Sequence, residues 1–371
     1  MDTSDPDIEF DSEGVCNHCH EYDRLVAQKV IGGDPGLRYL KHLVERMRRS
    51  GHRKKYDCLI GVSGGVDSTY VAYLVKKMGL RPLAVHVDNG WDSELAVKNI
   101  EEILKRLDID LFTEVLDWEE FRGVQVAFLE ASTPDSEIPS DHAIAAVLGN
   151  MADRLGVPYI ISGANVRTET HIPRSWSQGH FDWGYIQSVY RRYGSGQLKT
   201  FPHVGFFTYY RRLLTQRRID ILNYVEYSKS AAMKTVAEEL GWRDYGGKHH
   251  ESIYTRFYQG FLLPAKFGYD KRRSHLSSLV CSGEIARQAA LSRLAEPAYA
   301  PSLQEEDREY VIKKLGLTEA GFQEILGRPK KTYWDYPSYG RVLEGRLLGG
   351  IYSAAREAYR RLQKRRHQAE A

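Results

Sequence analysis

The chemistry of this chain is concentrated in seven consecutive residues, Ser63–Thr69, with the sequence SGGVDST. The residues before them, Tyr56–Val62, are mostly apolar and end at a turn signal, which predicts a buried strand. The residues after them, Tyr70–Met78, predict a helix with lysines in its last turn. A turn from a strand into a helix presents free backbone N–H groups and the positive end of the helix dipole to an anion. We therefore predict a phosphate site at this turn.

The residue types in this turn suit a bound phosphate. Glycine lets the backbone come close to a ligand, and hydroxyls can donate hydrogen bonds to phosphate oxygens. A carboxylate would repel a bare phosphate, so Asp67 predicts a Mg²⁺ ion between the two. The residues predicted to hold the phosphates are Ser63, Gly64, Gly65, Asp67, Ser68 and Thr69. The segment matches neither the Walker pattern nor G-x-G-x-x-G and resembles the pyrophosphate loop of ATP pyrophosphatases, which cleave ATP between its α and β phosphates.

Further strands alternate with helical patterns up to about residue 170. Predicted strands cover Pro82–Val87, Ile109–Leu116 and Tyr159–Ile161, and apolar residues at helical spacing separate them. This alternation predicts an α/β protein with a parallel, doubly wound sheet. Ligands of such sheets bind at the carboxyl ends of the strands, where Asp88–Trp91 and Ser162–Asn165 also lie.

Composition limits the classes of protein that this chain can belong to. The 371 residues are enough for about two domains. The formal net charge of +3 argues against a dedicated nucleic-acid binder, which usually carries a strong basic excess. We find no apolar run long enough to span a membrane and no signal peptide, and four cysteines do not suggest a disulfide framework. We expect a cytoplasmic protein.

We divide the chain into four parts. These are residues 1–30 with Cys16 and Cys19, an ATP-binding α/β domain at 31–170, a substrate-facing insertion with a cationic segment at 171–280, and a helical region at 281–371. Residues 171–215 are rich in aromatic side chains and arginine, which suits either a sugar or nucleotide or a packing layer between domains. In the C-terminal part, Ser302 and Glu305 have the spacing of a capping box.

A second segment with chemical potential begins at Lys248-His249-His250-Glu251 and continues through 263–278. Cations here could neutralise the charge that builds up when pyrophosphate leaves, or could form a surface cluster. One histidine could act as an acid or base, and Glu251 could orient it or bind Mg²⁺. The candidate cations are Lys248, Lys271, Arg272 and Arg273.

Six segments together resemble the N-acetyl sugar amidotransferases of bacterial surface polysaccharide synthesis. They are GVCNHC, SGGVDST, SEIPSDHAI, ISGANVRTE, GGKHHES and FGYDKRRSHLSSLVCSGEI, and they extend over nearly the whole chain. This resemblance implies conversion of a sugar acetamido group to an acetamidino group, for O-antigen or nonulosonic acids. It implies ATP, Mg²⁺, an N-acetylated sugar that can be nucleotide-linked, and ammonia from a glutaminase and synthase-like pair resembling HisH and HisF.

The resemblance also implies roles for particular residues. The SGGVDST loop would hold the pyrophosphate end of ATP, and Val87, Asp88 and Gly163 would hold adenosine. The residues expected to act in catalysis are Asp67, Lys248, His249, Glu251, Lys271 and Arg272.

The cysteines are candidate zinc ligands. The family pattern has another C-x-x-C immediately before the stretch that matches Met1-Asp2-Thr3, and two such pairs would form a zinc ribbon. The resemblance therefore implies either a start further upstream or a site completed by other residues. Cys16 and Cys19 would then bind Zn²⁺ with Cys281 and with His18 or His20.

Two other functions remain open. A tRNA thiolase of the same fold would need a strongly basic surface and an exposed reactive cysteine, whereas Cys58 lies within the first predicted strand. A non-catalytic ATP-binding scaffold subunit would bind ATP without releasing pyrophosphate.

Overall fold

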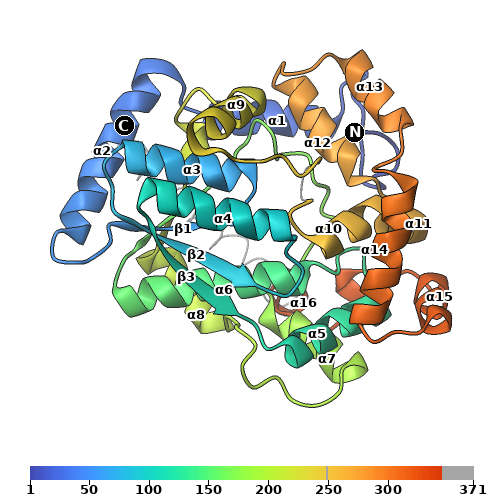
Figure 1. Cartoon of the computed structure of the whole chain (residues 1–371). Coiled ribbons are helices and arrows are strands. Elements are labelled where there is room, and N and C mark those ends of the chain that lie inside the picture. Colours follow the sequence, from blue (N-terminus) through green and yellow to red (C-terminus); the bar gives the residue numbers. More distant parts are fainter. Residues whose placement is uncertain (248–249, 345–371) are drawn as a thin grey trace.

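A five-stranded parallel sheet forms the centre of the protein (Figure 1). The computed structural model describes residues 1–247 and 250–344. The strands are β1 (Cys58–Gly61), β2 (Pro82–Asp88), β3 (Asp110–Val115), β4 (Tyr159–Ser162) and β5 (Arg217–Asp220), in the order β3-β2-β1-β4-β5. Every neighbouring pair is parallel. The strand order reverses between β1 and β4, the kind of position at which open α/β sheets bind ligands.

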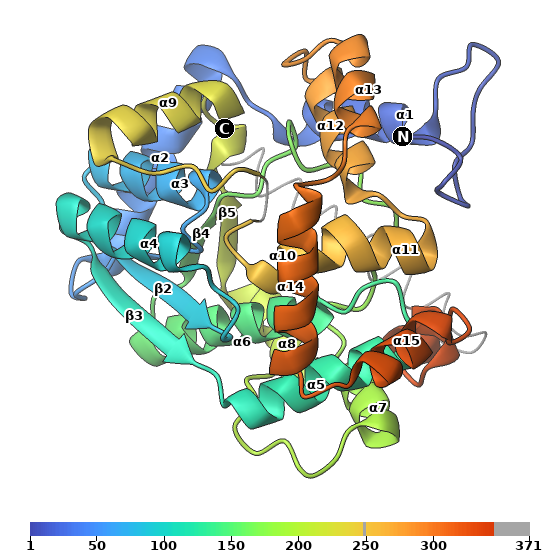
Figure 2. The ribbon, with the colours of Figure 1, turned by 45° about the vertical axis from the view of Figure 1, so that its right-hand side comes forward.

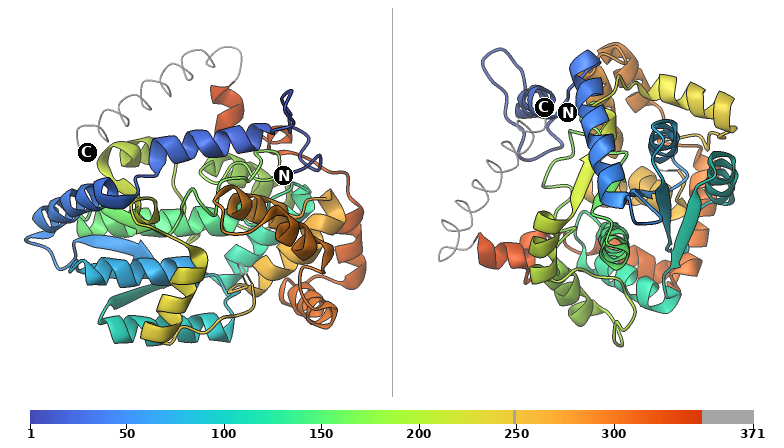
Figure 3. Two further views of the ribbon diagram at one scale, coloured as in Figure 1. Left: turned by 90° about the horizontal axis from the view of Figure 1, so that it is seen from above. Right: turned by 90° about the vertical axis from the view of Figure 1, so that its left-hand side faces the viewer.

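Helices cover both faces of this sheet. The helices of the α/β part are α2 (Gly33–Gly51), α3 (Val66–Lys77), α4 (Glu94–Leu107), α5 (Trp118–Ala131), α6 (Ile138–Leu155) and α9 (Lys229–Leu240). One buried cluster joins α2, α3, α4 and α9 through side chains such as Met47, Val71 and Val236. A second cluster joins α5 and α6 through Phe128 and Val147. The right-hand view of Figure 3 shows the sheet between α2 and the green helices of the other layer. The predicted doubly wound fold is confirmed.

The region that follows the α/β part is mostly helical, and the predicted helical character of the C-terminal region is confirmed for the described residues. It begins at α10 (Ile253–Phe257), which continues through the π-helical turn η2 (Tyr258–Leu262) into α11 (Leu263–Phe267). The next elements are α12 (Lys271–Cys281), α13 (Arg287–Ala295), α14 (Pro301–Lys314), α15 (Glu319–Gly327), η3 (Tyr333–Asp335) and α16 (Tyr339–Leu343). Figure 2 shows α10 and α14 on the side to which the arrowhead of β2 points. These helices therefore lie near the edge of the sheet that carries the carboxyl ends.

The remaining elements lie before the sheet, in the aromatic-rich segment and directly after β5. They are α1 (Asn17–Lys29), α7 (Trp183–Tyr193), α8 (Phe206–Thr215) and η1 (Ile221–Asn223). No helix among the described residues has the length and apolar character to cross a bilayer.

Two expectations about elements were wrong. The strand–helix alternation does not end near residue 170, because β5 joins the edge of the sheet beside β4. Its sequence, RRID, has one buried residue, Ile219, so it lacks the apolar run that identifies an inner strand. Ser302 is also not a helix cap, because α14 begins at Pro301 and Ala300 occupies the N-cap position.

Candidate active site

The loop between β1 and α3 takes the conformation that an anion site requires. Gly65 is the N-cap of α3, so the free N–H groups of the first turn face the loop. Gly64 has a φ of +79°, and a Cβ at this position would lie 2.7 Å from the carbonyl oxygen of Ala96. Only glycine fits both the conformation and the space. The glycine signal in the sequence therefore has a steric cause.

Hydroxyls of the same loop hold it in a tight turn. The Ser63 backbone N–H donates to Ser68 Oγ at 3.3 Å, and Ser68 Oγ donates to the Gly65 carbonyl at 3.1 Å. Thr69 is buried, and its backbone N–H donates to the Gly65 carbonyl at 3.0 Å as part of the helix. Ser63 and Ser68 are therefore the hydroxyls that a ligand can reach.

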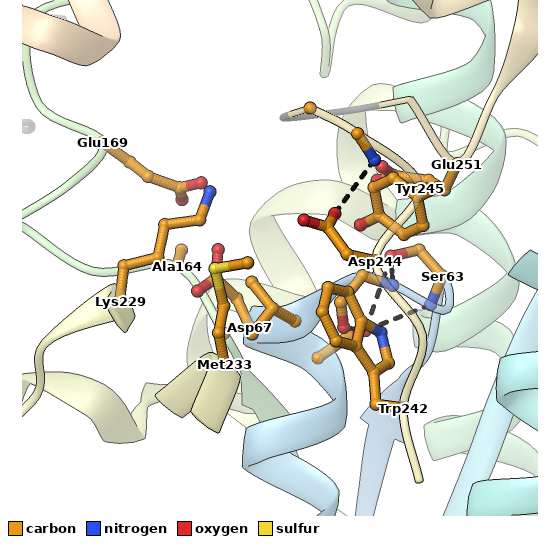
Figure 4. Close-up of a pocket in the computed structure, with 16 residues that line it drawn as sticks. Ser63, Asp67, Ala164, Glu169, Lys229, Met233, Trp242, Asp244, Tyr245 and Glu251 are labelled. Carbon is orange, nitrogen blue, oxygen red and sulfur yellow. Dashed lines mark hydrogen bonds between the residues drawn. The ribbon is translucent and has the colours of Figure 1, made fainter. Parts of the chain in front are cut away.

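A cavity of about 370 Å³ opens beside this loop (Figure 4). Its walls combine the loop, the end of β4, the start of α9, the segment after α9 and one residue before α10. The lining residues are Ser63, Gly65, Val66, Asp67, Ser68, Gly163, Ala164, Glu169, Lys229, Met233, Trp242, Asp244, Tyr245, Gly246, Gly247 and Glu251. Its volume is in the range of small-molecule sites. The structure thus brings six predicted site residues, Ser63, Gly65, Asp67, Ser68, Gly163 and Glu251, to one cavity.

Asp67 is held between β4 and the segment before α9. A Cβ at Gly163 would lie 3.1 Å from the backbone of Asp67, so β4 and α3 approach closely here. The Tyr227 hydroxyl donates a hydrogen bond to Asp67 Oδ1. Burial, together with the negative charge of Asp67, raises the pKa of Tyr227, so its hydroxyl remains a donor. The orientation of the Asp67 carboxylate is therefore fixed.

The charges of the cavity fit a nucleotide carried with Mg²⁺. Four carboxylates, those of Asp67, Glu169, Asp244 and Glu251, line it together with the Lys229 ammonium. Mg²⁺ usually binds one or two protein carboxylates together with substrate phosphates. No three His, Cys, Asp or Glu side chains of residues 1–247 and 250–344 are arranged to hold a metal ion. Asp67 lies in the SGGVDST segment itself and is the carboxylate that would hold a Mg²⁺ ion together with bound phosphates.

Glu251 and Tyr245 lie over the phosphate loop. From the Cβ position of Gly65, the Tyr245 hydroxyl is 3.2 Å away and Glu251 Oε1 is 3.6 Å away. Burial, with the charge of Glu251 and a hydrogen bond to it, raises the pKa of Tyr245. In Figure 4 these two side chains and Asp244 lie on the opposite side of the cavity from Glu169 and Lys229.

The predicted cations of the C-terminal region are engaged away from this cavity. Lys271 is buried, and its Nζ lies 3.1 Å from Glu137 Oε2. Arg272 binds Asp270 and the backbone carbonyls of Arg293 and Glu296. Arg273 pairs with Asp2. Lys248 and His249 lie outside the described residues.

Val87 and Asp88 stand at the carboxyl end of β2 without lining the cavity. Val87 is buried in the core cluster of the α5–α6 face. Asp88 Oδ1 accepts a hydrogen bond from the Gly90 backbone at 2.8 Å and so shapes the turn after β2. Their adenosine-binding role stays a prediction.

Three of the four cysteines lie close together at the start of α1 and the end of α12. Cys16 Sγ and Cys19 Sγ are 3.5 Å apart, and burial, together with the neighbouring thiols of Cys16 and Cys281, raises the pKa of Cys19. Cys281 Sγ lies 3.7 Å from Nε2 of His171, whereas His18 and His20 pair with Asp5 and Asp11. Zinc binding stays a prediction. Cys58 is fully buried within β1, as expected of a core thiol.

Reasoning from the sequence missed several residues of the site. These are Glu169, Tyr227, Lys229, Trp242, Asp244 and Tyr245. Two of them could have been identified from their place in the sequence, since Tyr227 and Trp242 flank the helix α9, which the sequence predicts. Nothing in the local pattern shows that this helix returns to pack against α3.

Comparisons with known proteins agree with these observations. Residues 251–347 match the family described as LPS biosynthesis protein WbpG-like, C-terminal domain. Shorter stretches are similar to tRNA(Ile)-lysidine synthases, with 39% identity over 70 residues for Chlamydia pneumoniae and 41% over 54 residues for Chlamydia caviae. These stretches are 18% and 15% of this chain, which spans about a fifth of the length of these relatives.

Solved structures were also compared with the whole chain. The NMN synthetase from Francisella tularensis has 14% identity and a TM-score of 0.35, covering 69% of this chain and 95% of that one. The NH3-dependent NAD synthetase from Campylobacter jejuni has 12% identity and a TM-score of 0.33, covering 80% and 98%. The SGGVDST turn follows β1 in a parallel sheet, as the resemblance of this segment to the ATP pyrophosphatases predicts. The stretch that is similar to the WbpG-like C-terminal domains, residues 251–347, follows this α/β part in the chain.

Proposed function

We propose that this protein is an ATP-dependent amidotransferase that converts the acetamido group of a sugar to an acetamidino group. One observation carries the proposal: Glu251, the first residue of the WbpG-like region, lines the same cavity as the SGGVDST loop. A region typical of polysaccharide synthesis thus contributes to a site suited to ATP.

The proposed reaction starts at the amide oxygen of the acetamido group. This oxygen attacks the α-phosphorus of ATP, and pyrophosphate leaves. Backbone N–H groups of the loop and of the first turn of α3, with the hydroxyls of Ser63 and Ser68, hold the pyrophosphate end. Lys229 opposes the charge that develops there. Asp67 would hold a Mg²⁺ ion, which would supply Lewis-acid stabilisation.

The second half-reaction replaces the oxygen by nitrogen. Ammonia attacks the carbon of the O-adenylyl imidate, a proton leaves the nitrogen, and AMP departs with the former amide oxygen. The products are an amidine, AMP and pyrophosphate. The carboxylates of Asp244 and Glu251 lie across the cavity from Lys229 and can accept the proton (Figure 4).

The substrate and partner follow from the same proposal. The acceptor is an N-acetylated sugar, nucleotide-linked or a nonulosonic-acid precursor, and the aromatic segment 171–215 would hold it. Ammonia would come from a glutaminase and synthase-like pair.

Isotope labelling tests this function. The protein is incubated with MgATP, ammonium and a panel of UDP-linked sugars that carry ¹⁸O in the acetyl group, and products are followed by mass spectrometry. We expect the sugar to exchange oxygen for NH and the ¹⁸O to appear in AMP. If ¹⁸O instead appeared in inorganic phosphate and ADP were formed, the amide oxygen would have been activated by phosphorylation, which would contradict this mechanism.

Similarity to the tRNA(Ile)-lysidine synthases makes tRNA a second acceptor to test. AMP released only when tRNA is added would favour an RNA-modifying enzyme. Cys58 does not suit a thiolase nucleophile, because it is fully buried and burial raises its pKa. ATP binding without turnover, also with a glutaminase partner present, would favour the scaffold function.

A further inference from the structure

Helix α9 is joined to the phosphate loop at both of its ends. Just after α9, the indole Nε1 of Trp242 donates to the backbone carbonyl of Gly64 at 2.9 Å. Just before α9, the hydroxyl of Tyr227 donates to Asp67 Oδ1. Trp242 is 5% exposed and Tyr227 is 6% exposed, so solvent competes little for either bond. Two buried donors that flank one helix therefore reach Gly64 and Asp67, two separate points of the SGGVDST segment.

Neighbouring contacts hold α9 and its flanks in place. The helix packs against α3. Its N-cap is Ser228, whose Oγ accepts from the Ala231 backbone N–H, and its C-cap is Gly241, with a φ of +70°. Asn99 of α4 then binds the backbone of Arg243 twice, at 2.8 and 3.1 Å. Trp242 therefore lies between two fixed points of the chain.

The bond from Trp242 has a specific consequence for phosphate binding. An anion site made from backbone requires N–H groups toward the ligand and carbonyl groups away from it. The positive φ of Gly64 sets the direction of the peptide groups on either side of it. The buried carbonyl of Gly64 then accepts its hydrogen bond from the indole N–H of Trp242. Without that donor, a buried carbonyl loses its partner, which favours a different loop conformation.

We propose that Trp242 and Tyr227 are positioning residues that hold the phosphate loop in its anion-binding form. Trp242 fixes the backbone at Gly64, and Tyr227 fixes the carboxylate of Asp67, which would bind the Mg²⁺ ion of the nucleotide. This inference rests on the proposed binding of ATP at the loop, and it does not depend on which acceptor is amidated.

Binding of the non-cleavable analogue α,β-methylene-ATP with Mg²⁺ tests Trp242. In Trp242→Phe the ring is kept and the hydrogen bond is lost, so we expect the Kd to rise by about tenfold, typical of one lost buried hydrogen bond. The matched control is Trp176→Phe. Trp176 is fully buried, stacks on Tyr269, and its Nε1 has no hydrogen-bond partner among the described residues. Equal Kd values for the two variants would overturn the role of Trp242.

Tyr227 is tested through the metal rather than the nucleotide. In Tyr227→Phe we expect about threefold to tenfold more Mg²⁺ to be needed for half-maximal binding of the analogue, since Asp67 is no longer oriented. The matched control is Tyr73→Phe. Tyr73 is also buried, and its hydroxyl donates to a carboxylate, Glu239 Oε2, at a distance of 2.7 Å. Neither Tyr73 nor Glu239 lines the cavity. An unchanged Mg²⁺ requirement in Tyr227→Phe would overturn its role.

These readouts separate the inference from the proposed function. If the wild type binds the analogue but forms no amidine, the function is wrong, and the variant affinities still decide the inference. If amidine forms but Trp242→Phe binds like Trp176→Phe and Tyr227→Phe needs no more Mg²⁺, the inference alone is wrong. Thermal melting of each variant checks that the fold is kept.

Discussion

Gly64 concentrates three structural demands in one residue. Its φ is +79°, a Cβ would meet the Ala96 carbonyl oxygen at 2.7 Å, and its own carbonyl accepts the bond from Trp242. The first two demands exclude a side chain, and the third fixes the direction of the peptide. The sequence motif alone shows that glycine is suited here, but only the packing of α4 and α9 explains why the position admits nothing else.

Replacing this glycine should impair both binding and stability. In Gly64→Ala we expect at least a tenfold higher Kd for α,β-methylene-ATP and a loss of about 1–3 kcal/mol of unfolding free energy, from backbone strain and the clash with Ala96. Isothermal titration and urea unfolding measure the two effects. Gly205→Ala is the control, because its φ is −71° and no atom lies within 4 Å of a Cβ there. Equal behaviour of the two variants would show that the loop tolerates a side chain.

At the scale of elements, the start of α6 gathers charged side chains from distant parts of the chain. Lys271 at the start of α12 pairs with Glu137 at 3.1 Å. His180, from the segment before α7, lies 3.5 Å from Asp135 and 3.3 Å from Asp141. These pairs tie the C-terminal region and the aromatic segment to the carboxyl edge of the sheet. The predicted cationic segment thus has a role in joining elements.

This arrangement predicts a pH dependence of stability. Burial opposes the charged form of His180, but Asp135 and Asp141 outweigh it and raise its pKa to about 10. The unfolded value is about 6.5, so the stabilisation is complete below about pH 6.5 and is lost as the pH rises toward 10. We expect His180→Gln to lie about 1–3 kcal/mol below the wild type at pH 6 in urea unfolding and to approach it at pH 9.5. A difference that is independent of pH would contradict a charged His180.

At the scale of the whole molecule, the sequence predicted the α/β core because that part consists of strong local patterns. Apolar runs identified β2 and β4, and the strand–turn–helix signal at SGGVDST identified the site. The sequence could not show which segments far along the chain pack against the SGGVDST loop and against α6. Tyr227, Lys229 and Trp242 reach the loop only because α9 packs on α3. Lys271 pairs with Glu137, which lies 134 residues earlier in the chain. Contacts of this kind leave no trace in local periodicity.

The bond between Trp242 and Gly64 also sets an order of events during synthesis. It joins residues 178 positions apart, while β1, β2 and β3 with their helices are complete by residue 131. As the chain leaves the ribosome, these three strands can pair while the turn at Gly64 still lacks its distant donor. A nascent chain that ends before residue 242 therefore cannot make this bond, and the proposed binding of ATP would be a late event in the maturation of the protein.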